Sequence, residues 1–172
     1  DGTTEAITIT ISGTNDVPTV SGVVTGSSTD AGSIFTIDLL AGATDADTSD
    51  TLITTGVTLV SGDATGATVN TDNTISVDPS VYKHLGVGQD LDITYAYDVV
   101  DTNGASVSQT AVITVTGTND VSVITGDIVG AIAEDGTSVS GALIVTDIDT
   151  NGPAFQAETV SGNYGSVTID AA

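Results

Sequence analysis

The sequence contains no cysteine, no methionine and no tryptophan, and lysine and arginine together contribute one residue. Without cysteine, the chain forms neither disulfide bonds nor thiolate metal sites. Zinc prefers histidine and cysteine ligands, and the chain holds a single histidine. The composition therefore excludes a disulfide scaffold and a zinc site.

Positive charge is almost missing as well. Aspartate and glutamate number 23, so the formal net charge is −22 at pH 7. Such a chain is repelled by phosphate backbones and by anionic membrane surfaces, which excludes nucleic acid as a natural partner. No apolar run approaches the roughly 20 residues of a membrane helix. We expect neither direct membrane insertion nor a signal peptide, as for a fragment of a longer protein.

What the sequence does contain is alternating Val, Ile and Thr. Acidic chains with few aromatics are often disordered, but hydrophobic residues make up 39% here and mean hydropathy is +0.28. In "LDITYAYDV", residues 91–99, apolar and polar residues alternate with the period of a half-buried strand. We therefore predict folded β structure.

Similar runs recur along the chain, separated by turn clusters such as "SGDATG" and "DTNG". We predict strands near residues 7–12, 17–24, 33–39, 52–60, 66–70, 74–78, 91–99, 107–116, 121–129, 138–146, 155–160 and 164–169. Seven of these lie between residues 17 and 116, which is enough for one two-sheet sandwich.

A repeat sets the domain organisation. The run "ITISGTNDVP" at residues 9–18 returns as "ITVTGTNDVS" at residues 113–122, an offset of 104. The fold class is therefore predicted to be all-β, a tandem β-sandwich with one complete module flanked by partial modules. We expect the last strand and linker of a preceding repeat in residues 1–16, a complete sandwich in 17–119 and the N-terminal part of a following repeat in 120–172.

Acidic residues cluster where the predicted strands end. Asn15 and Asp16 form the link before the complete module, Asp45 and Asp47 form a D-x-D, and Asp98 ends the strand "ITYAYD". Calcium takes about six to eight oxygen ligands from carboxylates, amides, carbonyls and water. Because a sandwich can bring these groups to one end, the pattern predicts a calcium site there.

The other acids have a simpler interpretation. Asp and Asn are common turn formers that bond their own backbone. We interpret Asp30, Asp63, Asp72, Asp90 and Asp127 as solvated turn residues. Asp101, in "DVVDTNG", is either a turn residue or a support for the metal ligands.

The sequence gives little basis for catalysis. Lys83 and His84 are adjacent in "VDPSVYKHLGVG", with no second basic residue to complete a site, so we expect neither to have a chemical role. A carboxylate pair acting on a sugar usually lies in a cleft with aromatic walls. Aromatic residues are 3% of this chain. We therefore predict that the protein is not an enzyme.

Two segments carry a family resemblance. The runs "YAYDVVDTNGASVSQTAVITVTGTND" and "ATDADTSDTL" resemble cadherin-like repeats, in particular those of large repetitive (RTX-type) bacterial adhesins. The segment 121–172, with "AIAEDGTSVSGALIVTDIDTNGPAFQAETVSGNYGSVTIDA", resembles the bacterial repeats called VCBS. Both resemblances imply Ig-like sandwiches.

The cadherin resemblance also implies calcium ligands at each junction between modules. At the first junction it points to Asn15, Asp16, Asp45, Asp47 and Asp98. At the second it points to Asn119, Asp120, Asp147 and Asp149, with Glu134 and Asp135 as additional candidates. The sequence shows no clear counterpart of the upstream acidic pair or of the Glu that closes the first strand in cadherins. We therefore expect one or two calcium ions per junction.

The function implied by the resemblance is mechanical. It describes calcium-stiffened extender repeats of a Gram-negative cell-surface adhesin, which project a distal binding region for adhesion and biofilm formation. The partners would be neighbouring repeats, with head-to-tail self-association through unpaired strands. Two alternatives are a calcium-dependent polysaccharide-binding module of a secreted protein, and surface acidity that keeps the fold soluble in a salty habitat.

Overall fold

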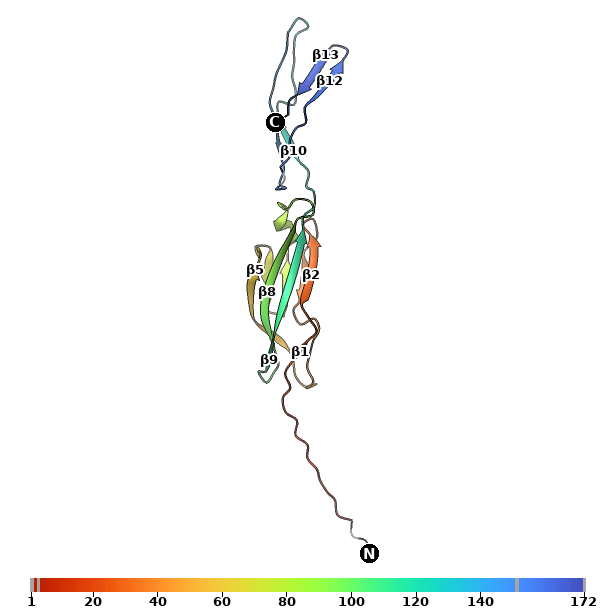
Figure 1. Ribbon diagram of the computed structural model, residues 1–172, viewed down its shortest axis with the longest axis vertical. Helices are drawn as coiled ribbons and strands as arrows, with labels where there is room; N and C mark the ends of the chain where they lie inside the picture. Colours follow the sequence, from red (N-terminus) through yellow and green to blue (C-terminus); the bar gives the residue numbers. More distant parts are fainter. Residues whose placement is uncertain (1, 3, 151, 172) are drawn as a thin grey trace.

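The computed structural model describes residues 2, 4–150 and 152–171. It is an all-β structure with one short 3-10 helix, η1 (Pro79–Tyr82), which confirms the predicted all-β class. In Figure 1 a β-sandwich occupies the middle of the molecule. The chain enters at one end of the sandwich and continues into β10–β13 beyond the other.

The strands of the sandwich fall into two main sheets. They are β1 (Thr19–Val20), β2 (Val24–Thr29), β3 (Phe35–Asp38), β4 (Ala43–Thr44), β5 (Ile53–Ser61), β6 (Ala67–Val69), β7 (Thr74–Val77), β8 (Asp90–Val100) and β9 (Ser106–Thr116). One sheet has the order β2-β9-β8-β5 and the other β3-β7-β6, while β1 pairs with β4. The β2–β9 pairing is parallel and the remaining pairings are antiparallel.

The alternating pattern of β8 and β9 becomes an alternation of burial. Ile93 pairs with Ile113 and Tyr95 with Ala111, and all four side chains face the opposite sheet. The core contains Val24, Ile37, Leu39, Ile75, Val77, Tyr82, Ile93, Tyr95, Tyr97, Val99, Ala111, Ile113 and Val115. Each large buried apolar side chain contributes roughly 1.5 to 3 kcal/mol, so this interface between sheets holds the fold together.

Two buried tyrosines keep their hydroxyl groups hydrogen-bonded inside this core. Tyr97 donates to the Leu39 carbonyl at 2.7 Å. Tyr82, in η1, donates to the Asp63 carbonyl at 2.9 Å and accepts from the Gly66 amide at 2.8 Å. Burial raises the pKa of Tyr97 to about 12, with a smaller effect from the charge of Asp38. Each tyrosine thus ties a connecting segment to the core.

The N-terminal part of the sandwich differs from the predicted single strand at 17–24. The chain turns after β1 and pairs again as β2, which runs to Thr29. The sequence of β2, "VTGSST", buries one large side chain, Val24, because it lies at the sheet edge. Gly26 allows this edge to lie close to the other sheet, since an added Cβ would be 2.6 Å from Cδ1 of Ile37.

The strand predicted at 7–12 is wrong. These residues form no strand in the described chain, and Ile7, Ile9 and Ile11 are exposed. Alternation alone does not make a strand, because the backbone also needs a partner for its hydrogen bonds. None of the described residues pairs with this segment.

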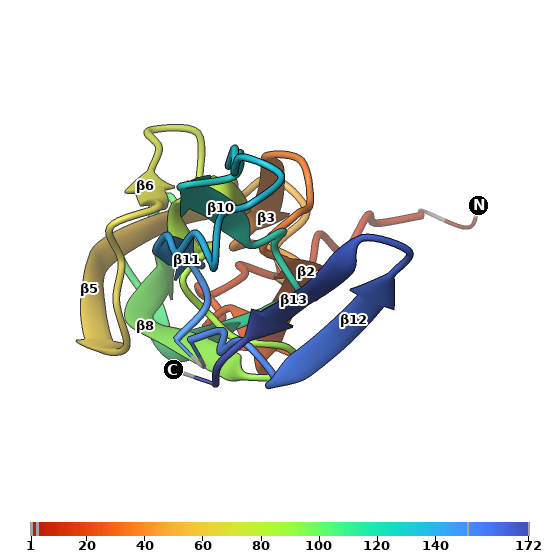
Figure 2. The same ribbon diagram turned by 90° about the horizontal axis from the view of Figure 1, so that it is seen from above.

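Residues 120–171, here called the C-terminal segment, form two hairpins. β10 (Val123–Gly126) pairs with β11 (Leu143–Thr146), and β12 (Glu158–Gly162) pairs with β13 (Gly165–Ile169). Figure 1 shows the β12–β13 ribbon beyond the end of the sandwich, and the view from above in Figure 2 shows it displaced to one side. The core side chains given above all precede the C-terminal segment. Within the described residues, no helix is long and apolar enough to cross a membrane.

Replacement of Tyr97 by Phe tests the buried hydroxyl. The variant leaves the Leu39 carbonyl without its donor, so the free energy of unfolding should fall by about 1 to 2 kcal/mol. Tyr164→Phe is the matched control because Tyr164 is fully exposed, and its effect should stay below about 0.5 kcal/mol. Urea denaturation measures both, and equal stability of the two variants would contradict the assigned role.

Candidate metal centre at the two ends of the sandwich

Three connections meet where the chain enters the sandwich. The β8–β9 turn follows Val100, and the register pairs Val100 with both Ser106 and Ile53. The β4–β5 connection, residues 45–52, therefore lies at the same end as this turn. The link around Asn15 and Asp16 is bonded to both connections, and we call this cluster the first junction.

A group of carboxylates forms the centre of the first junction. Asp45, Asp47 and Asp50 each offer an oxygen, and these oxygens lie within 4.8 Å of one another. The backbone amide of Asp47 donates to Oδ1 of Asp45 at 2.8 Å, which folds the D-x-D into a turn. Oδ2 of Asp45 is buried and has no hydrogen-bond partner among the described residues.

The link is held to this group by hydrogen bonds. The amide of Asp16 donates to Oδ2 of Asp47 at 2.8 Å, and Nδ2 of Asn15 donates to Oδ2 of Asp101 at 2.8 Å. Nδ2 of Asn103 donates to Oδ1 of Asn15 at 2.7 Å and to Oδ2 of Asp50 at 2.9 Å. The predicted grouping of Asn15, Asp16 and the D-x-D is therefore present in the geometry. Asp50 and Asn103 also belong to it, and the sequence analysis did not single them out.

Asp101 is a buried member of the first junction, with 4% of its surface exposed. Its Oδ1 accepts from the amides of Asn103 and Ala105 at 2.9 Å each. The Asn15 side chain, assisted by these backbone donors, lowers the pKa of Asp101. Of the two interpretations of Asp101, the structure supports more than a turn residue, because its second oxygen binds the link.

Asp98 does not join this group. Its Oδ1 accepts from the Ser108 hydroxyl at 2.8 Å, across the β8–β9 pair. Val99 is fully buried, so the alternation of β8 turns Asp98 to the outer face of the sheet. The strand continues to Val100, and Asp101 is the acid that reaches the end. Placing Asp98 with Asn15 and the D-x-D is therefore wrong.

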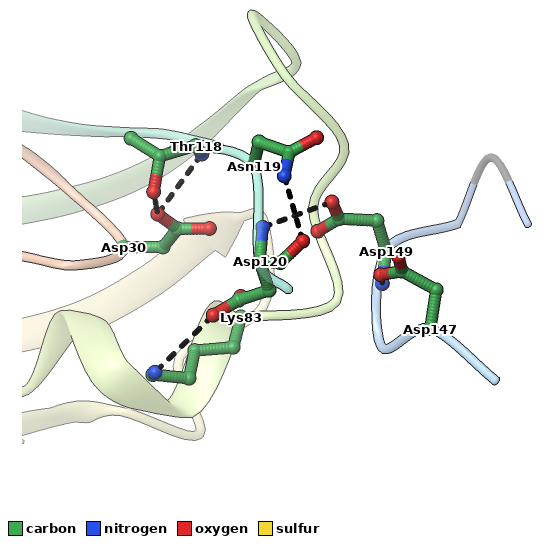
Figure 3. Close-up of polar contacts among 7 residues, drawn as sticks. All are labelled: Asp30, Lys83, Thr118, Asn119, Asp120, Asp147 and Asp149. Carbon is green, nitrogen blue, oxygen red and sulfur yellow. Dashed lines mark hydrogen bonds and ion pairs between the residues drawn. The ribbon is translucent and has the colours of Figure 1, made fainter. Parts of the chain in front are cut away.

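The same arrangement recurs where the chain leaves the sandwich, at the second junction (Figure 3). The amide of Asp120 donates to Oδ2 of Asp149 at 3.1 Å, and the amide of Asp149 donates to Oδ1 of Asp147 at 2.9 Å. Nδ2 of Asn119 donates to the Asp120 carbonyl at 2.7 Å, as Asn15 does to the Asp16 carbonyl at 3.1 Å. The Ser122 hydroxyl, assisted by backbone amides, lowers the pKa of Asp147.

The sandwich contributes an acid of its own to the second junction. Asp30 follows β2 and is 1% exposed, so its interpretation as a solvated turn residue is wrong. Oδ1 of Asp30 accepts from the Thr118 amide at 3.0 Å and hydroxyl at 2.6 Å. Oδ2 is buried and has no partner in the described part of the chain, and Figure 3 shows it on the side of Asn119 and Asp120.

Lys83 also lies at the second junction, and its lack of a chemical role stays a prediction. Its ammonium group lies 3.4 Å from Oδ1 of Asp120. Glu134 and Asp135, in contrast, lie in an exposed turn between β10 and β11. Val123 pairs with Thr146 at the end of this hairpin nearest Asp120 and Asp147, whereas the turn follows the opposite end. The structure therefore places Glu134 and Asp135 away from the second junction.

The donor set fits a hard divalent cation. Buried side-chain oxygens without a hydrogen-bond partner, within the parts of the chain described, are Oδ2 of Asp30, Oδ2 of Asp45 and Oδ1 of Asp149. All three belong to the junctions. A buried polar atom without a partner needs an explanation such as an ion. Carboxylate and amide oxygens are the ligands that calcium prefers.

The two sheets packed around one core place the central part of the chain in the class of Ig-like β-sandwich modules. The model of the cadherin-like domain family matches residues 14–116, and the chain belongs to this family. Cadherin-like domains are non-enzymatic, typically extracellular adhesion modules, and cadherin domains generally bind Ca²⁺. No curated protein matches the chain.

Among solved structures, the chain is similar to protocadherin gamma B7 extracellular cadherin domains 1–4, with 16% sequence identity and a TM-score of 0.46. The match covers 88% of this chain and 40% of that chain. The chain therefore spans less than half the length of that structure.

Acid should weaken the fold partly through Asp101. Because its pKa is lower in the folded state than the roughly 3.9 of an unfolded Asp, its contribution to stability is complete above about pH 5 and is lost as pH falls through the folded pKa. Asp101→Asn should be less stable than the parent at neutral pH and should lose less stability between pH 5 and pH 3. The pKa values of Asp63 and Asp147 are also lowered, so the stability of the variant should still fall with decreasing pH, but less steeply. Denaturation without calcium measures the free energy of unfolding at each pH. An equal loss of stability in Asp101→Asn and in the parent between pH 5 and pH 3 would contradict this role.

Proposed function

We propose that this chain is a set of extender repeats of a large bacterial cell-surface adhesin, stiffened by calcium at the junctions between modules. The observation that carries the proposal is the recurrence of one hydrogen-bonded Asn-Asp and D-x-D arrangement at both ends of the sandwich. At both ends it is accompanied by buried carboxylate oxygens for which the described residues supply no hydrogen-bond partner.

The residues that would hold calcium come from the link and from the strand ends. At the first junction they are Asn15, Asp16, Asp45, Asp47, Asp50 and Asp101. At the second junction they are Asp30, Asn119, Asp120, Asp147 and Asp149. Two unit charges 4 Å apart repel by about 4 kcal/mol at an intermediate dielectric. A bound cation relieves this repulsion, whereas its removal leaves a link between ends that repel each other.

The position of the links suits a spacer. The entering and leaving links lie at opposite ends of the sandwich, so successive modules would continue in one direction (Figure 1). The module boundaries at residues 16/17 and 119/120 are part of this proposal. Neighbouring repeats would be the natural partners, and the unpaired alternation at 7–12 would add to the sheet of another module. The work of the segment is then to hold a distal binding region away from a Gram-negative cell surface, in adhesion and biofilm formation.

A polysaccharide-binding module of a secreted protein is the second candidate. The observation that favours it is a shallow cleft of about 560 Å³ at the second junction, lined in part by Lys83, Asp120 and Asp147. A calcium ion there would bridge sugar hydroxyls. A glycan array read with calcium and with chelator tests this candidate, and calcium-dependent retention of a glycan would favour it over a pure spacer.

Calcium should change both shape and stability. Extracellular calcium modules bind with Kd of about 10⁻⁴ to 10⁻³ M, so the response should fall in the millimolar range. At about 100 Kd the ion adds roughly 2.7 kcal/mol to the free energy of unfolding. Small-angle scattering should show a narrower range of shapes with calcium than with chelator, and thermal melting should shift upward.

Asp47→Asn is the sharpest variant for this test. It keeps an oxygen for the Asp16 amide but removes one charge from the D-x-D, so the calcium affinity of the first junction should fall at least tenfold. Asp98→Asn is the matched control, because Asp98 lies on the outer face of the sheet. If calcium changes neither shape nor melting temperature of the parent, the acids are structural and surface residues only.

A further inference from the structure

The sequence contains a single lysine, Lys83, and no arginine. Lys83 lies at the second junction. Its side chain is 44% exposed and that of Asp120 is 26% exposed. Figure 3 shows the lysine reaching from the loop after η1 toward the carboxylate of the link. The chain has 23 acidic residues, so many other carboxylates were available as partners, and the pairing of this ammonium group with Asp120 is notable.

The two D-x-D segments differ by one carboxylate. Aligned at an offset of 102, Asp45 and Asp47 correspond to Asp147 and Asp149, while Asp50 corresponds to Gly152. Asp50 is a member of the close carboxylate group at the first junction. The D-x-D segment of the second junction thus has one carboxylate fewer than that of the first. The second junction also has the Lys83 ammonium group.

The loop that carries Lys83 makes two further contacts with the C-terminal segment. The Thr150 amide donates to the His84 carbonyl at 3.0 Å. The Thr150 hydroxyl donates to Oε1 of Gln89 at 2.8 Å. These bonds use neutral groups, so they need no metal ion to form. The segment is therefore attached to the sandwich on the side where Lys83 meets Asp120.

We propose that the Lys83 ammonium group takes the place of one metal cation at the second junction. The junction then keeps part of its orientation when calcium is removed, whereas the first junction, with Asp45, Asp47 and Asp50 together, depends on the ion. This inference rests on the proposed function, since it assigns different calcium dependence to two calcium junctions. It describes a spacer whose links loosen at different calcium concentrations.

A tethered ammonium group has two physical consequences. Because Lys83 is part of the chain, a chelator cannot remove it, so the attraction between its ammonium group and Asp120 persists when calcium is absent. It also adds a like charge beside any calcium ion bound there, which weakens binding. Lys83 is partly exposed, so water screens it. For a unit and a double charge about 7 Å apart at the dielectric of water, about 80, the effect on affinity is about three- to tenfold.

The experiment compares the full chain with Lys83→Met and Lys83→Arg. Amide hydrogen exchange measured by NMR reports the second junction at Asp120, Asp149 and Thr150, and the first junction at Asp16. In chelator, the three second-junction amides should exchange at least tenfold faster in Lys83→Met than in the parent. Lys83→Arg should retain the slow exchange, and the Asp16 amide should be the same in all three proteins.

A calcium titration followed at the same amides completes the test. Lys83→Met should bind calcium at the second junction about three- to tenfold more tightly than the parent, because the like charge is gone. Unchanged exchange of Lys83→Met in chelator would overturn the role of Lys83 while leaving the calcium junctions intact. A parent protein in which calcium alters neither junction would overturn the proposed function, and the chelator comparison would still decide the role of the lysine.

Discussion

The antiparallel pairing of β8 with β9 is the interaction on which the rest of the structure depends. Over eleven residues in each strand it directs alternate side chains into the core and pairs Val100 with Ser106 at one end and Asp90 with Thr116 at the other. The turn at the first end presents Asp101 to the entering link, and the continuation at the second end becomes Thr118 and the leaving link. One register therefore sets both the core and the separation of the two junctions.

The second constraint is charge. Backbone and amide donors hold the acids of both junctions in fixed positions, as the Asp16 and Asp120 amides do for the D-x-D carboxylates. Such donors stabilise a carboxylate, but they do not cancel its charge. Acids brought together in this way repel each other, and a buried oxygen of Asp45 and one of Asp149 have no hydrogen-bond partner among the residues that the structure describes. A bound metal ion would resolve both features at once, whereas the Lys83 ammonium group offsets charge at Asp120 only.

Much of the fold was predictable, because strands such as β8 and β9 bury every second residue and carry that period in the sequence. Asp45 and Asp47 were predictable as a pair because a D-x-D turn is local. Asp30 was not, since its burial follows from the parallel pairing of β2 with β9, far apart in sequence. Asp98 was placed wrongly because the sequence did not show that β8 continues to Val100. The segment 7–12 has the right pattern, but pairing depends on a partner strand that pattern alone does not supply.

The junctions separate two tasks that are often combined in one binding site. Hydrogen bonds from the link fix where the acids lie, and these bonds recur in nearly the same form at both ends. The balance of charge around them does not recur, because Gly152 stands at the position of Asp50 and Lys83 pairs with Asp120. A change at either position alters the electrostatic energy of a junction, while the hydrogen bonds from the Asp16 and Asp120 amides to the D-x-D carboxylates can stay in place. In the proposed spacer, one or two residues would therefore set the calcium dependence of each link, while the sandwich between the links stays the same.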